Sequence, residues 1–182
     1  MERLPNRKPN RLPCCDYSSI GAYFITICVQ DMRCILSTVE SDGMPESAYS
    51  VLSALGESVN RILLDINTHY HDIRLDHFVI MPNHVHLLIS ITDEGPDGAS
   101  GTLPPTETGT PRTSSPTNAL SSFVGGFKKF SEKACGIKIW QRGFHDHIIR
   151  SDDDYRRHWQ YIDENPKKWV MGKDAYYGFG PL

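Results

Sequence analysis

Residues 78–89 read Phe78-Val79-Ile80-Met81-Pro82-Asn83-His84-Val85-His86-Leu87-Leu88-Ile89. The apolar runs on either side of Pro82-Asn83 predict two strands, over 72–81 and 84–91, that pair antiparallel around a turn. Because side chains alternate along a strand, His84 and His86 are expected on one face of the sheet and Val85 on the other. Two imidazoles on one face can converge on a single metal ion.

The sequence on both sides of this hairpin predicts the remaining elements. Runs of β-branched and aromatic residues predict strands over 22–29 and 144–149. Apolar residues at helical spacing predict helices over 46–67, 118–135 and 151–165. Ser151 is expected to cap the last helix, and Pro166 to end it. The order β-α-β-β-α-β predicts an α+β ferredoxin-like sandwich, an antiparallel sheet with helices on one face, plus a C-terminal helix.

The chain of 182 residues is expected to form a single domain over 1–182. Residues 1–17 are rich in Pro, Arg and Asn and predict an extended basic arm. Residues 93–117 are dominated by Gly, Pro, Thr and Ser and predict a mobile loop insertion. No apolar run is long enough to span a bilayer, and no secretory signal is recognisable. The five cysteines form no CxxC pair, which favours reduced thiols and a cytoplasmic location.

The formal net charge is −3, but the charges are unevenly distributed. Acidic residues outnumber basic ones in residues 30–119, whereas basic residues outnumber acidic ones in 1–29 and in 120–168. Contacts to nucleic-acid phosphates, if present, are therefore expected at the N-terminus and in the last third of the chain. An ordinary solvated surface is an equal alternative on charge alone.

Tyr161 is the candidate nucleophile on the last helix. On a helical wheel Tyr155, Trp159 and Ile162 form an apolar stripe suited to docking on the sheet, and Tyr161 lies off that stripe. One helical turn away from Tyr161 lie Arg157, His158 and Asn165. A partly buried surface tyrosine is the structural alternative.

A tyrosine hydroxyl is a weak nucleophile while protonated, so it needs an activated electrophile. A cation held by His84 and His86 would polarise a phosphodiester, and Asn165 could supply a third ligand from the helix of the nucleophile. His158 is a candidate proton acceptor. Two other triplets, His69-Tyr70-His71 and His145-Asp146-His147, are rival metal sites, and the second is the stronger rival.

Five ordered blocks carry a family resemblance: Gly21-Ala22-Tyr23-Phe24-Ile25-Thr26-Ile27-Cys28, Met81-Pro82-Asn83-His84-Val85-His86-Leu87-Leu88-Ile89, Ile139-Trp140-Gln141-Arg142-Gly143-Phe144, Asp146-His147-Ile148-Ile149-Arg150 and Tyr161-Ile162-Asp163-Glu164-Asn165-Pro166. Together they resemble the REP-associated tyrosine transposases, a branch of the single-tyrosine HUH (IS200-like) transposases. The resemblance implies a ferredoxin-like catalytic domain, Mg²⁺ or Mn²⁺, and single-stranded DNA recognised beside a hairpin.

The resemblance also assigns roles to residues. It carries the nucleophile onto Tyr161 and the metal ligands onto His84 and His86, and Asn165 matches the polar third ligand. The implied reaction is cleavage and rejoining of DNA through a 5′-phosphotyrosine, without ATP. Relatives include dimers that share sites between subunits, so a homodimer is a further expectation.

Basic residues are the expected DNA contacts, because phosphate contacts position the nucleic acid. The candidates are Arg7, Lys8 and Arg11 in the N-terminal arm and Lys128, Lys129, Lys133, Arg142, Arg150 and Arg157 in the last third. Trp140 could stack on an unpaired base or pack in the core.

Two alternatives to a DNA strand transferase stay open. One is a domesticated hairpin-binding protein without strand-transfer activity, although such a protein need not retain Tyr161, His84, His86 and Asn165 together. The other is a metal-dependent phosphoesterase with H-x-H motifs. The two-motif phosphoesterases need paired His-x-Thr or His-x-Ser motifs, and the chain has neither.

Overall fold

Four strands form one sheet in which every neighbouring pair is antiparallel, in the order β4-β5-β1-β6. The structure is a computed structural model that describes residues 20–66, 70, 72–92 and 119–172. The strands are β1 (Gly21–Cys28), β4 (Ile73–Met81), β5 (His84–Ile91) and β6 (His145–Ile148). Pro82 and Asn83 form the turn between β4 and β5, as the sequence predicts, with Met81 opposite His84.

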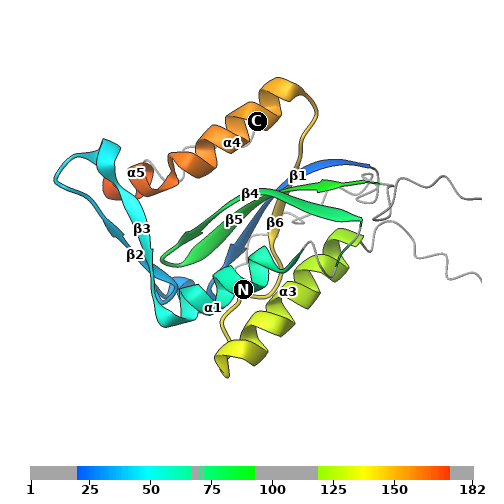
Figure 1. Ribbon diagram of the computed structural model, residues 1–182, viewed down its shortest axis with the longest axis horizontal. Coiled ribbons are helices and arrows are strands. Elements are labelled where there is room, and N and C mark those ends of the chain that lie inside the picture. The colour runs from blue at the N-terminus through cyan, green and yellow to red at the C-terminus, as the bar shows by residue number, and fades with distance from the viewer. Residues whose placement is uncertain (1–19, 67–69, 71, 93–118, 173–182) are drawn as a thin grey trace, which may run out of the picture.

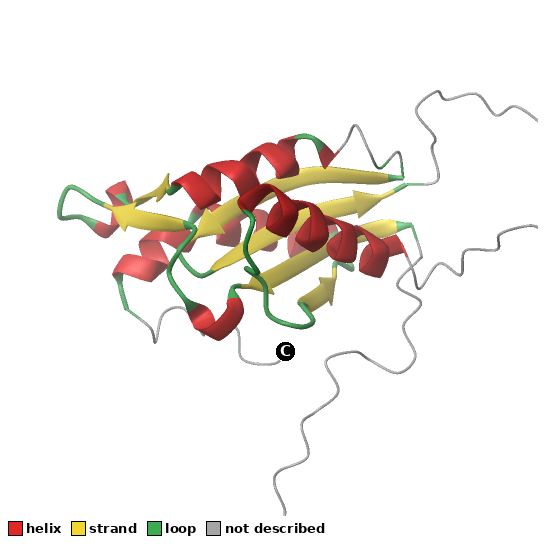
Figure 2. Cartoon of the chain, turned by 90° about the horizontal axis from the view of Figure 1, so that it is seen from below, coloured by secondary structure: helices red, strands yellow, loops and turns green. Residues whose placement is uncertain are grey.

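Helices cover both faces of this sheet. Helices α1 (Ala54–Leu64) and α3 (Ala119–Cys135) pack against each other on one face, and α4 (Asp152–Asp163) crosses the other face over β4 and β5 (Figure 1, Figure 2). The short helix α5 (Asn165–Val170) follows α4 on the same side. With α1 between β1 and β4 and α3 between β5 and β6, the predicted ferredoxin-like α+β sandwich with an added C-terminal helix is confirmed.

The main core lies between the sheet and the pair α1/α3. Alternate residues of the two central strands enter it: Tyr23, Ile25 and Ile27 from β1, and Val85, Leu87 and Ile89 from β5. All six are at most 1% exposed. Since neighbouring residues point to opposite faces, the residues between them face α4, and they include Phe24, Thr26, His84 and His86.

The predicted helix over 46–67 is wrong in its first half. Residues Tyr49–Leu52 form strand β3, which pairs with β2 (Ser37–Glu40) in a separate hairpin, and α1 begins only after Ser53. The Ser53 hydroxyl accepts a hydrogen bond from the Gly56 amide and caps the helix there. Val51 and Leu52 continue the helical spacing of α1 by coincidence, so the apolar period alone did not locate this boundary.

The prediction that Pro166 ends the last helix is also wrong in part. Helix α4 ends at Asp163, the chain turns at Glu164, and α5 starts at Asn165 with Pro166 in its first turn. Proline is tolerated there because the first amides of a helix have no partner within the helix. The small hairpin β2/β3 packs against α5, and Lys167 pairs with Glu46 across this contact at 3.1 Å.

Candidate active site

The two histidines of β5 lie at the start of the strand, on the face that α4 covers. His84 is fully buried and His86 is 4% exposed, and their ring centroids are 4.5 Å apart. Val85, between them, is buried in the main core on the opposite face. The strand therefore presents two adjacent imidazoles to one enclosed region.

Hydrogen bonds fix the orientation of both rings. His84 Nδ1 lies 2.7 Å from Oδ1 of Asn83, and His86 Nδ1 lies 2.8 Å from the Thr26 hydroxyl. His86 Nε2 is buried and has no hydrogen-bond partner among the described residues. A histidine whose one nitrogen is held by a protein group presents the other nitrogen in a fixed direction, as metal-binding histidines do.

Burial also keeps both rings uncharged. It lowers the pKa of His84 to about 3, partly offset by a hydrogen bond with Asn165. Burial lowers the pKa of His86 well below its usual value, and electrostatic interactions with His84, His158 and Lys168 lower it further. Metal binding requires neutral imidazole, so both rings are in the ligand form at neutral pH.

Tyr161 projects from α4 into the same region and is 7% exposed. Its ring meets His86 edge-on at a centroid distance of 5.2 Å, and the Lys168 ammonium lies 4.3 Å from its centroid on the ring face. Burial raises the pKa of Tyr161, and a hydrogen bond with Asn165 partly opposes this rise. The hydroxyl is therefore protonated at neutral pH and must lose its proton before or during any attack.

Asn165 connects the tyrosine with the histidines. It is fully buried at the start of α5, and its side chain influences the pKa of both His84 and Tyr161. Neither polar atom of its amide has a hydrogen bond of standard geometry to a described residue. The unpartnered buried Nε2 of His86, with neutral His84 and the buried Asn165 amide beside it, fits a divalent cation held by two nitrogens and one oxygen.

Three residues of this region were not predicted from the sequence: Phe24, Lys168 and Trp169. Phe24 on β1 stacks on His86 at 5.0 Å and meets the Tyr161 ring at 5.8 Å. Lys168 and Trp169, the latter 6.3 Å from His84 between ring centroids, come from α5. Lys168 and Trp169 follow Asn165 by three and four residues, which places them one turn away on a helix. A helix predicted beyond Pro166 would therefore have identified both residues as neighbours of Asn165.

The predicted docking stripe of α4 is only partly confirmed, because Ile162 is buried but Trp159 stays at the edge of the contact. The buried residues of the helix are Asp154, His158, Tyr161 and Ile162, whereas Trp159 is 38% exposed and lies flat against His77 on β4. The helix docks through polar and aromatic side chains because the sheet face beneath it presents the His pair and Phe24 beside apolar Leu88. Tyr161 consequently faces the sheet.

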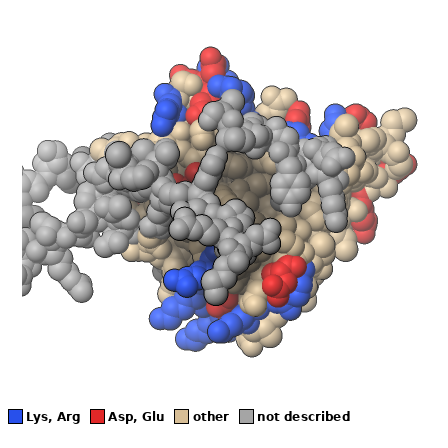
Figure 3. Space-filling view, turned by 180° about the vertical axis from the view of Figure 1, so that it is seen from behind, with Lys and Arg blue, Asp and Glu red and all other residues tan. Residues whose placement is uncertain are grey.

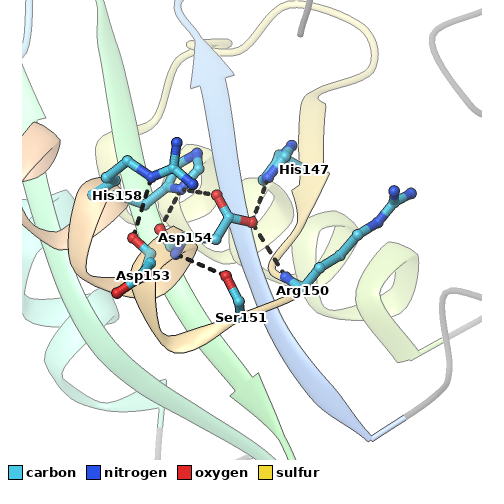
Figure 4. Close-up of polar contacts among 7 residues, drawn as sticks. His147, Arg150, Ser151, Asp153, Asp154 and His158 are labelled. Carbon is cyan, nitrogen blue, oxygen red and sulfur yellow. Dashed lines mark hydrogen bonds and ion pairs between the residues drawn. The ribbon is translucent and has the colours of Figure 1, made fainter.

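His158 lies beyond Phe24 from the His84/His86 pair. Its ring contacts Phe24 at 4.7 Å and stacks on His147 of β6 at 4.6 Å. Asp154 lies beside both histidines, 2.9 Å from His147 Nε2 and 3.2 Å from His158 Nδ1 (Figure 4). Of the rival triplet 145–147, only His147 joins this group, and His69 and His71 of the other triplet lie outside the described residues.

The candidate DNA contacts fall on different sides of the molecule. Figure 3 shows Lys and Arg along the lower edge, where α3 lies in Figure 1, and a mixed group of charges at the top edge, where α4 lies. Lys129 and Lys133 are exposed on α3, across the sheet from Tyr161. Arg150 and Arg157 are exposed at α4, on the side of Tyr161.

Two other candidates have structural partners. The Lys128 ammonium donates hydrogen bonds to the main-chain oxygens of Gln141 and Gly143, so it holds the segment before β6. Trp140 is 6% exposed and donates its indole N–H to Ser131 at 2.8 Å, which places it in the core. Arg142 is exposed in the segment between Trp140 and β6.

The predicted arm over 1–17 with Arg7, Lys8 and Arg11, and the predicted loop over 93–117, lie outside the described residues. Within the described parts of the chain, no helix has the length and apolar character needed to cross a bilayer.

Comparison with known proteins gives relatives along most of the chain. An uncharacterised protein of Haemophilus influenzae is 31% identical over 171 residues, which is 91% of each chain. A REP-associated tyrosine transposase of Escherichia coli is 34% identical over 96 residues, 51% of this chain and 45% of that protein. A second Haemophilus influenzae protein, provisionally given the same family name, is 27% identical over 155 residues, 84% of this chain and 74% of its own length.

A solved REP-associated tyrosine transposase, bound to a REP hairpin, superimposes with a TM-score of 0.51 at 21% identity, over 82% of this chain and 68% of that chain. No protein-family model matches the chain. The fold is accordingly the antiparallel α+β fold of a transposase domain. The chain is therefore similar to the REP-associated tyrosine transposases of the IS200-like family.

Proposed function

We propose that the protein cleaves and rejoins single-stranded DNA beside a hairpin, with Tyr161 as the nucleophile. The observation that carries this proposal is the convergence of Tyr161, His86 and Asn165. The tyrosine ring meets His86 at 5.2 Å, and the Asn165 side chain reaches both Tyr161 and His84. A nucleophile and a candidate cation site therefore come together from β5, α4 and α5.

The proposed step exchanges one phosphoester bond for another. The Tyr161 oxygen attacks the phosphorus and forms a phosphotyrosine with the 5′ end of the downstream fragment, while the bond from phosphorus to the 3′ oxygen of the upstream fragment breaks. The departing 3′ oxygen takes up a proton and leaves as a 3′-hydroxyl, and the tyrosine proton passes to a base. A second 3′-hydroxyl can attack the phosphotyrosine and rejoin the strand. The number of phosphoester bonds is unchanged, so no ATP is needed.

His84, His86 and Asn165 would hold the divalent cation, Mg²⁺ or Mn²⁺. When bound, the ion would stabilise negative charge on the non-bridging oxygens of the scissile phosphate. Two imidazole nitrogens and one amide oxygen make Mn²⁺ at least as suitable as Mg²⁺, because nitrogen is a softer ligand than the oxygens that Mg²⁺ prefers. The chain's own contribution is the fixed, neutral state of both rings.

His158 is the proposed proton acceptor. Burial lowers the pKa of His158, so the ring is neutral at neutral pH and can take up a proton. Its Nδ1 lies 2.8 Å from the main-chain oxygen of Asp154, which favours a proton on Nδ1 and the lone pair on Nε2.

The proposed substrate is a hairpin-bearing single strand, because the solved family member is bound to a REP hairpin. The exposed arginines Arg150 and Arg157 on the tyrosine side are the proposed phosphate contacts of the described residues. Proteins that bind DNA mainly through such contacts lose affinity as the salt concentration rises.

The test is formation of a covalent protein–DNA adduct. The full-length protein is incubated with labelled hairpin-bearing single strands, made from palindromic repeats sought by sequencing beside its gene, with Mn²⁺ or Mg²⁺, and resolved on a denaturing gel. We expect an adduct that disappears with Tyr161→Phe or with a chelator and returns when metal is restored. Tyr155→Phe, on the same helix and half-buried, is the matched control and should retain the adduct.

An adduct that survives Tyr161→Phe would overturn the assignment of the nucleophile. Hairpin binding without an adduct, across all the flanking repeats and both metals, would favour the alternative function, a hairpin-binding protein without strand transfer.

A further inference from the structure

A second cluster of metal-binding side chains lies beside the candidate active site. It consists of His147 on β6 and Asp154 and His158 on α4. One candidate ligand atom from each residue lies within 4.8 Å of the other two. Figure 4 shows the Asp154 carboxylate between the two rings.

The spacing of these atoms suits a small cation. The Asp154 carboxylate is 2.9 Å from His147 Nε2 and 3.2 Å from His158 Nδ1. Ligand atoms of a tetrahedral site with bonds of about 2.0–2.1 Å are roughly 3.3–3.4 Å apart. These two distances, to Oδ2 and Oδ1 of Asp154 respectively, are close to that spacing, and one ligand atom from each of the three residues lies within 4.8 Å of the others.

The ligand types select the class of metal. Two imidazoles and one carboxylate are the set that Zn²⁺ and related transition metals use when a fourth position stays open. An imidazole with one proton can carry it on either nitrogen, so each ring can present a lone pair to the ion without losing a proton. The His147 side chain is 41% exposed, which leaves a route for the ion from solvent.

This cluster is distinct from the His84/His86 pair. Phe24 separates them: its ring stacks on His86 at 5.0 Å on one side and contacts His158 at 4.7 Å on the other. The two groups share no ligand residue. An ion at the second cluster would link β6 to the helix that carries Tyr161.

Without an ion the same three side chains form a hydrogen-bonded network. Asp154 also accepts a hydrogen bond from the Arg150 amide, and its own amide donates to Ser151 at the start of α4. This network orients the carboxylate toward both rings before any metal arrives. Preorganised ligands of this kind lower the cost of binding, since less side-chain freedom is lost.

We propose that His147, Asp154 and His158 form a transition-metal site of the zinc type, which fastens helix α4 to strand β6. The site is separate from the cation site of the proposed reaction. The two proposals share only His158, and an ion held by this residue would exclude it as the proton acceptor of the reaction.

Zinc binding to the full-length, metal-stripped protein tests this proposal. Zn²⁺ is titrated against a chromophoric chelator, and Co²⁺ absorption reports the coordination geometry. We expect the His147→Ala variant to bind one zinc ion fewer per chain than the wild type does. The affinity should fall at least about 100-fold, because even loss of an outer-shell partner costs about 10–100-fold. His145→Ala is the matched control: His145 is exposed on the same strand and face, and the variant should keep the equivalent.

The double variant His84→Ala/His86→Ala separates the two sites and should retain the zinc equivalent that depends on His147. Circular dichroism verifies that each variant is folded. The proposal is overturned if His147→Ala binds as much zinc, as tightly, as the wild type does. It is also overturned if the zinc equivalent is lost with His145→Ala. Since the comparison of His147→Ala with the wild type needs no other variant, a double variant that does not fold leaves the test intact.

Discussion

The buried state of His84 predicts that the fold loses stability in acid through this one side chain. Burial lowers the pKa of His84 to about 3, whereas the unfolded chain takes up the proton near the ordinary value of about 6.5. Between these two values the unfolded state binds more protons than the folded state does. Falling pH therefore favours unfolding, and the loss accumulates as the pH drops from about 6.5 toward about 3.

The size of this effect follows from the two pKa values. One pKa unit corresponds to about 1.4 kcal/mol, so the full loss at pH 3 and below approaches about 5 kcal/mol. When the pH falls from 7 to 5, the protonation equilibrium of His84 lowers the free energy of unfolding by about 2 kcal/mol. His86 adds a loss of the same sign, because burial lowers its pKa as well.

Urea unfolding at pH 7 and pH 5, with a chelator present, measures this contribution. His84→Gln should lose about 2 kcal/mol less than the wild type between the two pH values, whatever its stability at pH 7. The exposed His145→Gln is the matched control and should follow the wild type. Equal losses in His84→Gln and the wild type would refute the reasoning that burial keeps this ring neutral.

Three further changes test other parts of the structure. Phe24→Leu should slow adduct formation about tenfold or more in a gel assay, because small displacements of reacting groups reduce the rate by at least that factor. Hairpin affinity in a mobility-shift assay should stay unchanged. An unaltered rate of adduct formation would contradict a positioning role for Phe24. Lys128→Met should lower the free energy of unfolding, measured in urea, by about 1.5–3 kcal/mol, because two charge-assisted hydrogen bonds are lost. The same change at exposed Lys129 should lower it by less than about 0.5 kcal/mol. Equal effects of the two variants would argue against the structural role of Lys128. Ser151→Ala should cost about 1 kcal/mol in thermal unfolding by removing the cap of α4, and no measurable change would exclude that cap.

The sheet was predictable because its signals are local. The strand β5 occupies the predicted residues 84–91, and the Pro82-Asn83 turn lies where the sequence places it. Alternation along the strand then fixes which side chains share a face, so His84 and His86 could be paired on one side without any knowledge of the rest of the fold.

The boundaries of the helices were less predictable. Val51 and Leu52 fit a helical period and yet form a strand, because β2 offers them hydrogen-bond partners that are distant in the sequence. Pro166 ends a helix in most contexts, but here a turn at Glu164 starts a new helix in which proline is acceptable. That second helix brings Lys168 and Trp169 to the site.

The sequence by itself determined the strand pattern, the adjacency of the two histidines and the presence of a tyrosine and an asparagine one helical turn apart. Only the tertiary structure decided which face of α4 meets the sheet. A helical wheel ranks the faces of a helix by hydrophobicity, so it favoured the face with Trp159. The wheel contains no information about the surface on which the helix packs. That surface carries Phe24 and His86 from two strands, so the polar and aromatic face of α4 is the complementary one, and it places Tyr161 beside the histidines.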